Sequence, residues 1–321
     1  MKRTQIVTHV MPTEIDEYSY IVDKLTEASH YLEKNDWISI YATLNISTEL
    51  VYWNESELNA DFFIEKFNRI KEKASWANEL IFEIVDDNSI LGTTAQKRKA
   101  IKGDYDQFIF LDCDIVFNPM TLKYMLMASE EIKNEYYFLT PQTVKLWDYT
   151  WDLITHKDFD EKEYGYEKHH TPEETYNQTI DEISVDTLEN INQSAEKATI
   201  VLRHRYTNQY NAFTDFKFAC GWFTLYSKSA IDLLGIPEWL GHYGPEDTYM
   251  MYGSQFYKIE KWPIYQYVLQ GIYVSENYVS RDTKYKDKVK LNNLKDKFRA
   301  EAESKFSEEL SKLKYTIKRF N

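Results

Sequence analysis

Asp112 and Asp114 stand two residues apart, directly after a stretch over 107–111 that is typical of a buried strand. If the chain turns between them, both carboxylates face one ligand. Hard carboxylate oxygens in small number suit Mg²⁺ or Mn²⁺ held jointly with substrate phosphates. Alternatively, both aspartates cap the helix that begins at Asn118 and Pro119. We expect the metal role, because burying clustered carboxylates without a cation is costly.

An alternation of strands and helices must position these aspartates. We expect strands over 37–44, 79–85 and 107–111, helices over 57–76 and 91–102, and a helix over 14–34 that opens the protein. Such an alternation with short connections predicts a parallel sheet with right-handed crossovers. Ligands of open parallel sheets bind outside the carboxyl ends of the strands. Asp86 ends the second strand at that edge, and Asp112 and Asp114 end the third.

The middle of the chain differs in composition. Residues 151–200 hold 13 Asp and Glu against four Lys, which predicts a long acidic insertion at about residues 148–212. We expect a strand over 216–226 and a helix over 228–235 after it, followed by a loop over 241–247.

From residue 284 apolar residues recur three or four apart, with 12 Lys and Arg against six acids. This pattern predicts a C-terminal amphipathic helical extension over 284–321, so the main domain would cover residues 1–283. The extension could pack on its own domain, on a second copy in a homo-oligomer, or on anionic lipid as a peripheral membrane contact.

Composition excludes several classes of protein. The net charge of −14 argues against a nucleic-acid partner, because neutralising phosphates needs a basic face. Two cysteines, Cys113 and Cys220, cannot build a disulfide framework, so we expect reduced, buried thiols. Neither a signal peptide nor an apolar run of membrane-spanning length is evident, which predicts a cytoplasmic protein. The 16% aromatic content reflects either codon bias or surfaces that stack on sugar rings.

One series of segments carries a family resemblance: Ile84-Val85-Asp86-Asp87-Asn88, Gly92, Ala95–Ile101, Gly103-Asp104-Tyr105 and Phe110-Leu111-Asp112-Cys113-Asp114. The series resembles the nucleotide-binding half of GT-A glycosyltransferases. The resemblance implies an α/β, Rossmann-like GT-A fold with a mostly parallel central sheet. It also implies that Asp86 and Asp112 contact the nucleotide sugar, and that Asp112 and Asp114 hold Mn²⁺ or Mg²⁺ on its diphosphate.

Lys97 and Arg98 stand where the family has the basic residue of an Ala-Arg-Asn helix. The resemblance implies that they offset the charge of the donor diphosphate. The alternative is that they lie on a solvated helix face.

Gly221-Trp222-Phe223 and Gly244-Pro245-Glu246-Asp247-Thr248-Tyr249 form a second match. They resemble the acceptor and catalytic region of inverting galactosyl- and N-acetylgalactosaminyl-type transferases. The resemblance implies that Asp247 is the general base that inversion requires, that Glu246 binds the acceptor, and that Gly221 and Trp222 line the acceptor pocket. The alternative is a turn that only starts a helix over 248–256.

The match ends at the metal-binding His of that group, since Val279 stands in its place before Ser280-Arg281-Asp282. Glu276, Asn277, His242 or water could supply the third metal ligand.

These features together predict a metal-dependent, inverting hexosyltransferase. Its donor would be a nucleotide sugar, with a UDP-sugar favoured, and its acceptor a glycan, a glycolipid or another hydroxyl compound. A retaining glycosyltransferase, a nucleotidyltransferase and a non-catalytic sugar-nucleotide or glycan-binding module remain alternatives, since fold does not determine activity.

Overall fold

The computed structural model describes residues 2–46, 60–86, 92–144, 199–203, 222–247, 249–250, 253 and 264–276, and helical residues between 297 and 312. Gly221, Cys220 and the segment around Val279 lie outside these ranges. So does the expected insertion, apart from residues 199–203.

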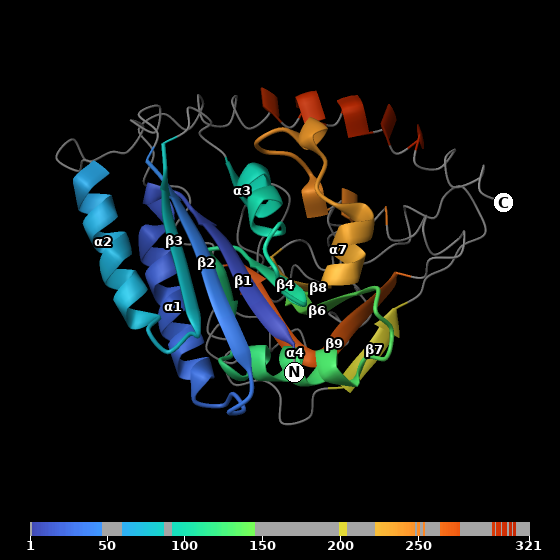
Figure 1. The fold of residues 1–321 in the computed structure, drawn as a ribbon, viewed down its shortest axis with the longest axis horizontal. Helices are drawn as coiled ribbons and strands as arrows, with labels where there is room; N and C mark the ends of the chain where they lie inside the picture. The colour runs from blue at the N-terminus through green and yellow to red at the C-terminus, as the bar shows by residue number, and fades with distance from the viewer. Residues whose placement is uncertain are drawn as a thin grey trace, which may run out of the picture.

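The described residues form a nine-stranded mixed sheet at the centre of the molecule (Figure 1). The strands are β1 (Arg3–Val10), β2 (Trp37–Asn45), β3 (Glu79–Val85), β4 (Gln107–Leu111), β5 (Ile115–Phe117), β6 (Tyr137–Val144), β7 (Thr199–Arg203), β8 (Phe223–Ser227) and β9 (Tyr265–Glu276). Their order is β3-β2-β1-β4-β8-β6-β9-β5, and β7 pairs with β9 off this path. The longest ladders, β1–β2, β2–β3 and β6–β9, are parallel. The expected α/β class with a mostly parallel sheet is therefore confirmed.

Strand β8 interrupts the parallel pattern in the middle of the sheet. It runs antiparallel to both β4 and β6. Leu111, the last residue of β4, therefore pairs with Phe223, the first residue of β8. This arrangement brings the residue before β8 next to the residue after β4.

Helices cover both faces of the sheet (Figure 1). They are α1 (Ile15–Ser29), α2 (Ala60–Lys73), α3 (Thr93–Ala100), α4 (Met120–Glu131) and α7 (Lys228–Leu234), with 3-10 turns at Pro12–Glu14 and Glu238–Leu240. Helices α1, α2 and α4 pack on one hydrophobic core, and α3 and α7 on a second. Alternating strand side chains divide between the two cores, so that Ile6 joins the first and its neighbour Val7 the second.

The helix periodicity at 14–34 predicted which side chains of α1 are buried. All six apolar positions that face the sheet are covered: Ile15, Tyr18, Ile21, Val22, Leu25 and Ala28. The helix ends at Ser29 rather than near residue 34, and Glu33 and Asp36 close a turn after it. Glu33 N–H donates to Asp36 Oδ2 over 2.8 Å, and Asp36 N–H donates to the Glu33 carbonyl over 2.9 Å.

The expectation that this helix opens the protein is wrong. Strand β1 precedes it and lies between β2 and β4 in the parallel part of the sheet. Apolar periodicity does not reveal this strand, because four of its eight residues are polar although they are buried. Thr4, Gln5, Thr8 and His9 are between 0% and 7% exposed.

The remaining expected helices occur close to their predicted bounds, whereas the expected strand over 216–226 is described only from Phe223, because residues 216–221 lie outside the described ranges. The helix over 57–76 corresponds to α2, the helix over 91–102 to α3, the helix over 228–235 to α7, and the strand over 216–226 to β8. Within the expected insertion, residues 199–203 form β7 and pair with β9.

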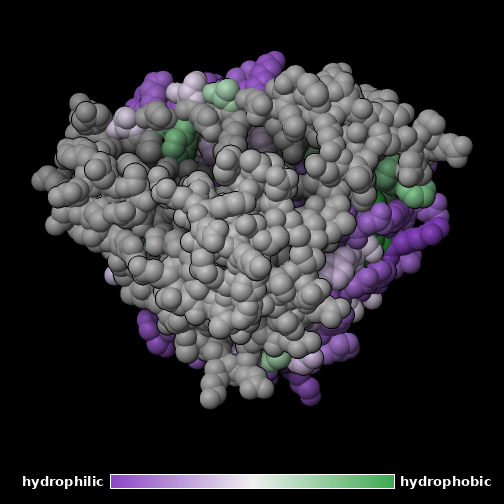
Figure 2. Space-filling model, turned by 180° about the vertical axis from the view of Figure 1, so that it is seen from behind, coloured by the Kyte–Doolittle hydropathy of each residue, from purple (hydrophilic) through white to green (hydrophobic). Residues whose placement is uncertain are grey.

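Figure 2 shows the surface of one face of the molecule. The described residues visible in Figure 2 are mostly hydrophilic, with small hydrophobic patches between them. No helix in the described part of the chain is long and apolar enough to cross a membrane.

Phe67 and Phe62 on α2 test the core beneath that helix. Phe67 is fully buried, with its ring centroid 4.8 Å from that of Phe82 and 6.0 Å from that of Tyr18. We expect Phe67→Ala to lower the free energy of unfolding by about 3–5 kcal/mol, because it leaves a cavity. Phe62→Ala is the matched control, since Phe62 is 42% exposed, and should cost less than about 1 kcal/mol. Urea unfolding measures both, and equal losses would contradict this packing.

Candidate active site at the carboxyl end of strand β4

Asp112 is the first residue after β4 and is tied to β8. Its backbone N–H donates to the Trp222 carbonyl over 2.9 Å, which extends the pairing of the two strands by one residue. The Asp112 side chain is 34% exposed. Trp222 is buried in the core on the α1 face, so little of its indole is open to a ligand.

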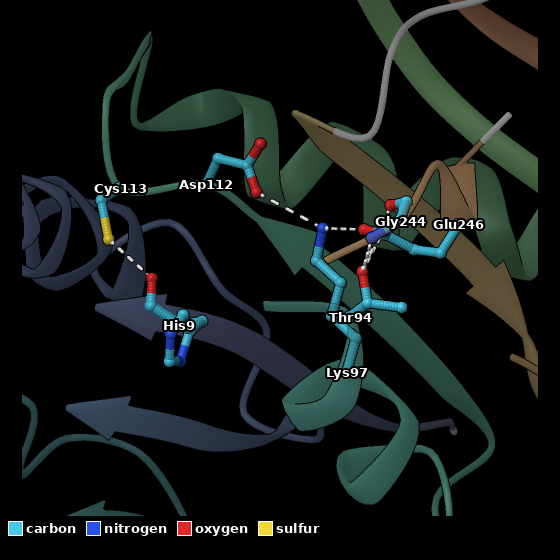
Figure 3. A network of polar contacts seen from close by, with 7 residues as sticks. All are labelled: His9, Thr94, Lys97, Asp112, Cys113, Gly244 and Glu246. Atoms are coloured by element: carbon cyan, nitrogen blue, oxygen red, sulfur yellow. Dashed lines mark hydrogen bonds and ion pairs between the residues drawn. The ribbon is translucent and has the colours of Figure 1, made fainter. Parts of the chain in front are cut away.

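Lys97 lies at the centre of a cluster of carboxylates. It projects from α3, its side chain is 4% exposed, and its ammonium contacts two acids (Figure 3). The Nζ atom lies 2.8 Å from Glu246 Oε1 and 3.5 Å from Asp112 Oδ1. Lys97 is therefore not on a solvated helix face. It links the Asp-x-Asp segment to the acidic loop, the name used below for residues 241–247.

The electrostatics of this cluster keep Lys97 charged. Burial alone lowers the pKa of Lys97, but the negative charges of Asp112, Glu246 and Asp247 raise it by more, and the net shift is upward. Asp247 also contributes to the raised pKa of the buried Tyr226, whose largest cause is burial. Asp247 itself is partly exposed and lies within electrostatic range of Lys97.

Both carboxylate oxygens of Glu246 are occupied. Oε1 accepts a hydrogen bond from Lys97, and Oε2 accepts one from Thr94 Oγ1 over 2.9 Å. Glu246 is 7% exposed. These contacts make Glu246 a buried anchor of the acidic loop.

Helix α3 holds the acidic loop through its first turn. The Thr94 and Ala95 N–H groups, which lack partners within the helix, donate to the His242 carbonyl over 3.0 and 3.4 Å. Thr94 Oγ1 accepts a hydrogen bond from the Gly244 N–H over 2.9 Å. These hydrogen bonds join two segments that lie 150 positions apart in sequence.

Arg98 binds the segment that leads into the acidic loop and the first residue of the loop, Gly241. Its guanidinium donates to the carbonyls of Ile236, Pro237 and Gly241 over 2.7–3.0 Å. It also forms an ion pair of 3.3 Å with the exposed Glu238. Arg98 thus lies neither on a solvated face nor in contact with Asp112.

The turn at 112–114 does not cap a helix. Residues 115–117 continue as β5, and the N-terminal turn of α4 uses Asn118 instead, whose Oδ1 accepts from Met120 N–H over 2.8 Å. The capping interpretation of Asp112 and Asp114 is therefore wrong. Asp114 is 4% exposed, which places a carboxylate inside the fold at this edge.

The neighbouring strands contribute polar groups that sequence patterns missed. Cys113 is a free, buried thiol that donates to the His9 carbonyl of β1 over 3.2 Å (Figure 3). His9 Nδ1 in turn lies 2.8 Å from Thr43 Oγ1 of β2. Neither His9 nor Thr94 belongs to a recognisable sequence motif. The Thr93-Thr94 pair at a helix start is the one pattern that could have indicated a polar role for Thr94.

Asp86 lies at the same edge but apart from the cluster. It is exposed and follows β3, so β2 and β1 separate it from β4.

The donor atoms of Asp112 and Asp114 are hard carboxylate oxygens, which suit Mg²⁺ or Mn²⁺. The formal negative charge of the Asp112, Glu246 and Asp247 carboxylates also exceeds the single positive charge of Lys97, so the cluster favours a further cation. Among the described residues no group of three or more His, Cys, Asp or Glu is arranged to hold a metal. Further ligands would come from substrate, from water or from residues outside the described ranges, such as Asn277.

No protein-family model matches the sequence, and no curated protein matches it significantly. The chain is similar to several solved structures. Staphylococcus aureus TarS 1–349 in complex with UDP-GlcNAc aligns with 87% of this chain and 61% of its own, at 12% identity and a TM-score of 0.45. The mannosyltransferase PcManGT from Pyrobaculum calidifontis, in complex with GDP-Man and Mn²⁺, aligns with 88% of this chain and 59% of its own, at 11% identity and 0.47.

Mannosyl-3-phosphoglycerate synthase from Rubrobacter xylanophilus aligns with 92% of this chain and 70% of its own, at 11% identity and a TM-score of 0.42. The chain spans less than two thirds of the length of the TarS and PcManGT chains. Similarities at this level assign neither family nor activity, so the function proposed below rests on the residues of this chain.

The ion pair of Lys97 and Glu246 should behave as a buried pair. We expect Lys97→Met to lower the free energy of unfolding by about 3–5 kcal/mol, because Glu246 then stays buried without its counter-charge. Adding Glu246→Leu to Lys97→Met should restore part of that loss. Lys99→Met is the control, since Lys99 forms an exposed pair with Glu83, and should cost less than about 1 kcal/mol. Urea unfolding of the wild type and the three variants measures these costs, and a Lys97→Met cost no larger than that of the control would contradict the buried pair.

Proposed function

We propose that this protein is a GT-A glycosyltransferase that moves a sugar from a nucleotide-diphosphate sugar to an acceptor hydroxyl with inversion. One observation carries the proposal. Lys97 contacts Asp112 of the Asp-x-Asp segment and Glu246 of the acidic loop, although the two acids lie 134 positions apart in sequence. The two motifs expected to handle the donor and the acceptor therefore meet at one edge of the sheet.

Asp247 is the better candidate for the general base. An inverting transfer needs one group that takes the proton from the acceptor hydroxyl as its oxygen attacks the anomeric carbon. Glu246 is buried, and both its oxygens already accept hydrogen bonds from Thr94 and Lys97, so its carboxylate is poorly placed to meet an acceptor hydroxyl. Asp247 is the next residue and is partly exposed. Glu246 then orients the loop, rather than binding the acceptor directly.

Asp112, Asp114 and Lys97 form the proposed donor side of the site. Asp112 is the more exposed of the two aspartates and can face a donor, whereas Asp114 is buried. A bound Mg²⁺ or Mn²⁺ would supply positive charge for the departing diphosphate. Lys97 contributes a fixed positive charge beside Asp112 and limits the repulsion between the carboxylates and the donor. Asp86, at the same edge, is proposed to contact the nucleoside.

Replacing Asp247 tests the general base. We expect Asp247→Asn to lower kcat by about 10²–10⁴-fold, because the amide cannot accept the proton, while donor affinity stays close to that of the wild type. Asp232→Asn is the control, since Asp232 is an exposed acid of α7 paired with Lys228, and should leave kcat unchanged. Full activity of Asp247→Asn would remove Asp247 as the base. The anomeric configuration of the product, observed by NMR, separates inversion from retention.

A melting-temperature panel tests the donor class. The melting temperature is measured with UDP-, GDP- and CDP-sugars, each with and without Mn²⁺. We expect at least one of these sugars to raise it, because a ligand that binds only the folded state stabilises that state by mass action. We expect the UDP-sugars to give the largest shift and Mn²⁺ to enlarge it. Asp114→Asn should abolish the Mn²⁺ increment. The absence of a shift with every nucleotide sugar would contradict the proposal.

A further inference from the structure

Two described residues of the C-terminal segment, the name used below for residues 297–312, pack at the acidic loop. The described residues of this segment are helical, and Figure 1 shows these turns, in red, next to the orange part of the chain that follows α7. Ala302 is 2% exposed, and its Cβ lies 3.1 Å from the position that a Cβ on Gly244 would take. At Ala302 the extension therefore packs on its own domain, which is one of the three alternatives left open by the sequence.

Phe306 makes the second contact. Its ring centroid lies 6.2 Å from that of Trp239 and 6.2 Å from that of Tyr249, and these two rings are 5.5 Å apart. The three rings meet edge to face, an arrangement that is favourable beyond the burial of area alone. Trp239 lies before the acidic loop and Tyr249 after it, so Phe306 connects both ends of the loop.

Tyr249 couples this aromatic cluster to Asp247. Its backbone N–H donates to the Pro245 carbonyl over 2.9 Å, which closes the helical turn that contains Glu246 and Asp247. A shift of the Tyr249 ring would therefore move the turn that carries the proposed base.

Gly244 shows how tightly the loop is confined. A Cβ at this position would lie 2.5 Å from the Leu240 carbonyl oxygen, in addition to its contact with Ala302. Thr94 binds the backbone of the same residue. The acidic loop is thus held by polar contacts from α3 and by apolar contacts from the C-terminal segment.

We propose that the C-terminal segment supports the active site. Phe306 and Ala302 hold the acidic loop in the conformation that positions Asp247 for sugar transfer. This inference rests on the proposed function. Phe306 and Ala302 are positioning residues, because they act through the loop and touch no reacting atom. Their loss should therefore lower turnover and leave binding of the donor, on the Asp112 side, largely intact.

Two substitutions test the inference from different directions in the full-length chain. Phe306→Ala removes the ring, and Ala302→Leu pushes a larger side chain toward Gly244. Each should lower kcat by about 10- to 100-fold, because small displacements of a catalytic group are costly. The dissociation constant for the donor should stay within about two-fold of the wild type. Phe306→Tyr should restore most of the turnover, and Lys305→Ala, an exposed neighbour, should behave as the wild type.

Hydrogen exchange supplies a readout that does not depend on activity. In Phe306→Ala the amides of Gly244, Glu246 and Tyr249 should exchange faster, while those of β1 and β4 keep their protection. Unchanged exchange at the three loop amides, or unchanged kcat in both Phe306→Ala and Ala302→Leu, would overturn the inference. If the wild type neither binds nor transfers any nucleotide sugar, the proposed function has failed, and the exchange data alone decide whether the segment holds the loop.

Discussion

A single buried ammonium organises this edge of the sheet. Lys97 is surrounded by the negative charges of Asp112, Glu246 and Asp247, and its raised pKa follows from their sum exceeding the effect of burial. Removing a charge from water costs several kcal/mol unless partners compensate for it. Lys97 and its acids therefore constrain one another: α3 must approach β4, and the acidic loop must approach α3. The proposed active site forms where Lys97 and these acids offset the cost of burying one another's charges.

The sheet supplies the geometry that makes the compensation possible. Strand β8 runs antiparallel beside β4, so Trp222 and Asp112 are neighbours although they are far apart in sequence. Alternating side chains separate two hydrophobic cores, and α3 lies on the same face as α7. Helix α3 can therefore reach the segment after α7 with Thr94, Lys97 and Arg98. The division into two faces places a helix and a loop from opposite halves of the chain in contact.

The acidic loop is held on two sides by different forces. Helix α3 contributes hydrogen bonds and ion pairs, which have strong directional preferences. The C-terminal segment contributes apolar contacts, which fix how closely the loop can approach. A general base benefits from such support, because its reactivity depends on a position defined to a fraction of an ångström. An enzyme that uses this site would have its C-terminal extension built into the catalytic unit.

Sequence patterns alone determined the local elements and the chemical types. The periodicity of residues 14–34 located the buried face of α1, and the stretch over 107–111 located β4 and the carboxylates that follow it. Tertiary structure decided everything that depends on pairing between distant segments. Strand β1 is polar and yet central, because it lies between β2 and β4 in a sheet that helices cover on both faces, so that Thr4, Gln5 and Thr8 are buried. Lys97 and Arg98, adjacent and chemically alike, differ completely: one is buried among acids and the other binds carbonyls. Successive helix positions project about 100° apart, so only the packing of α3 against the sheet and the acidic loop determines which of them meets Asp112.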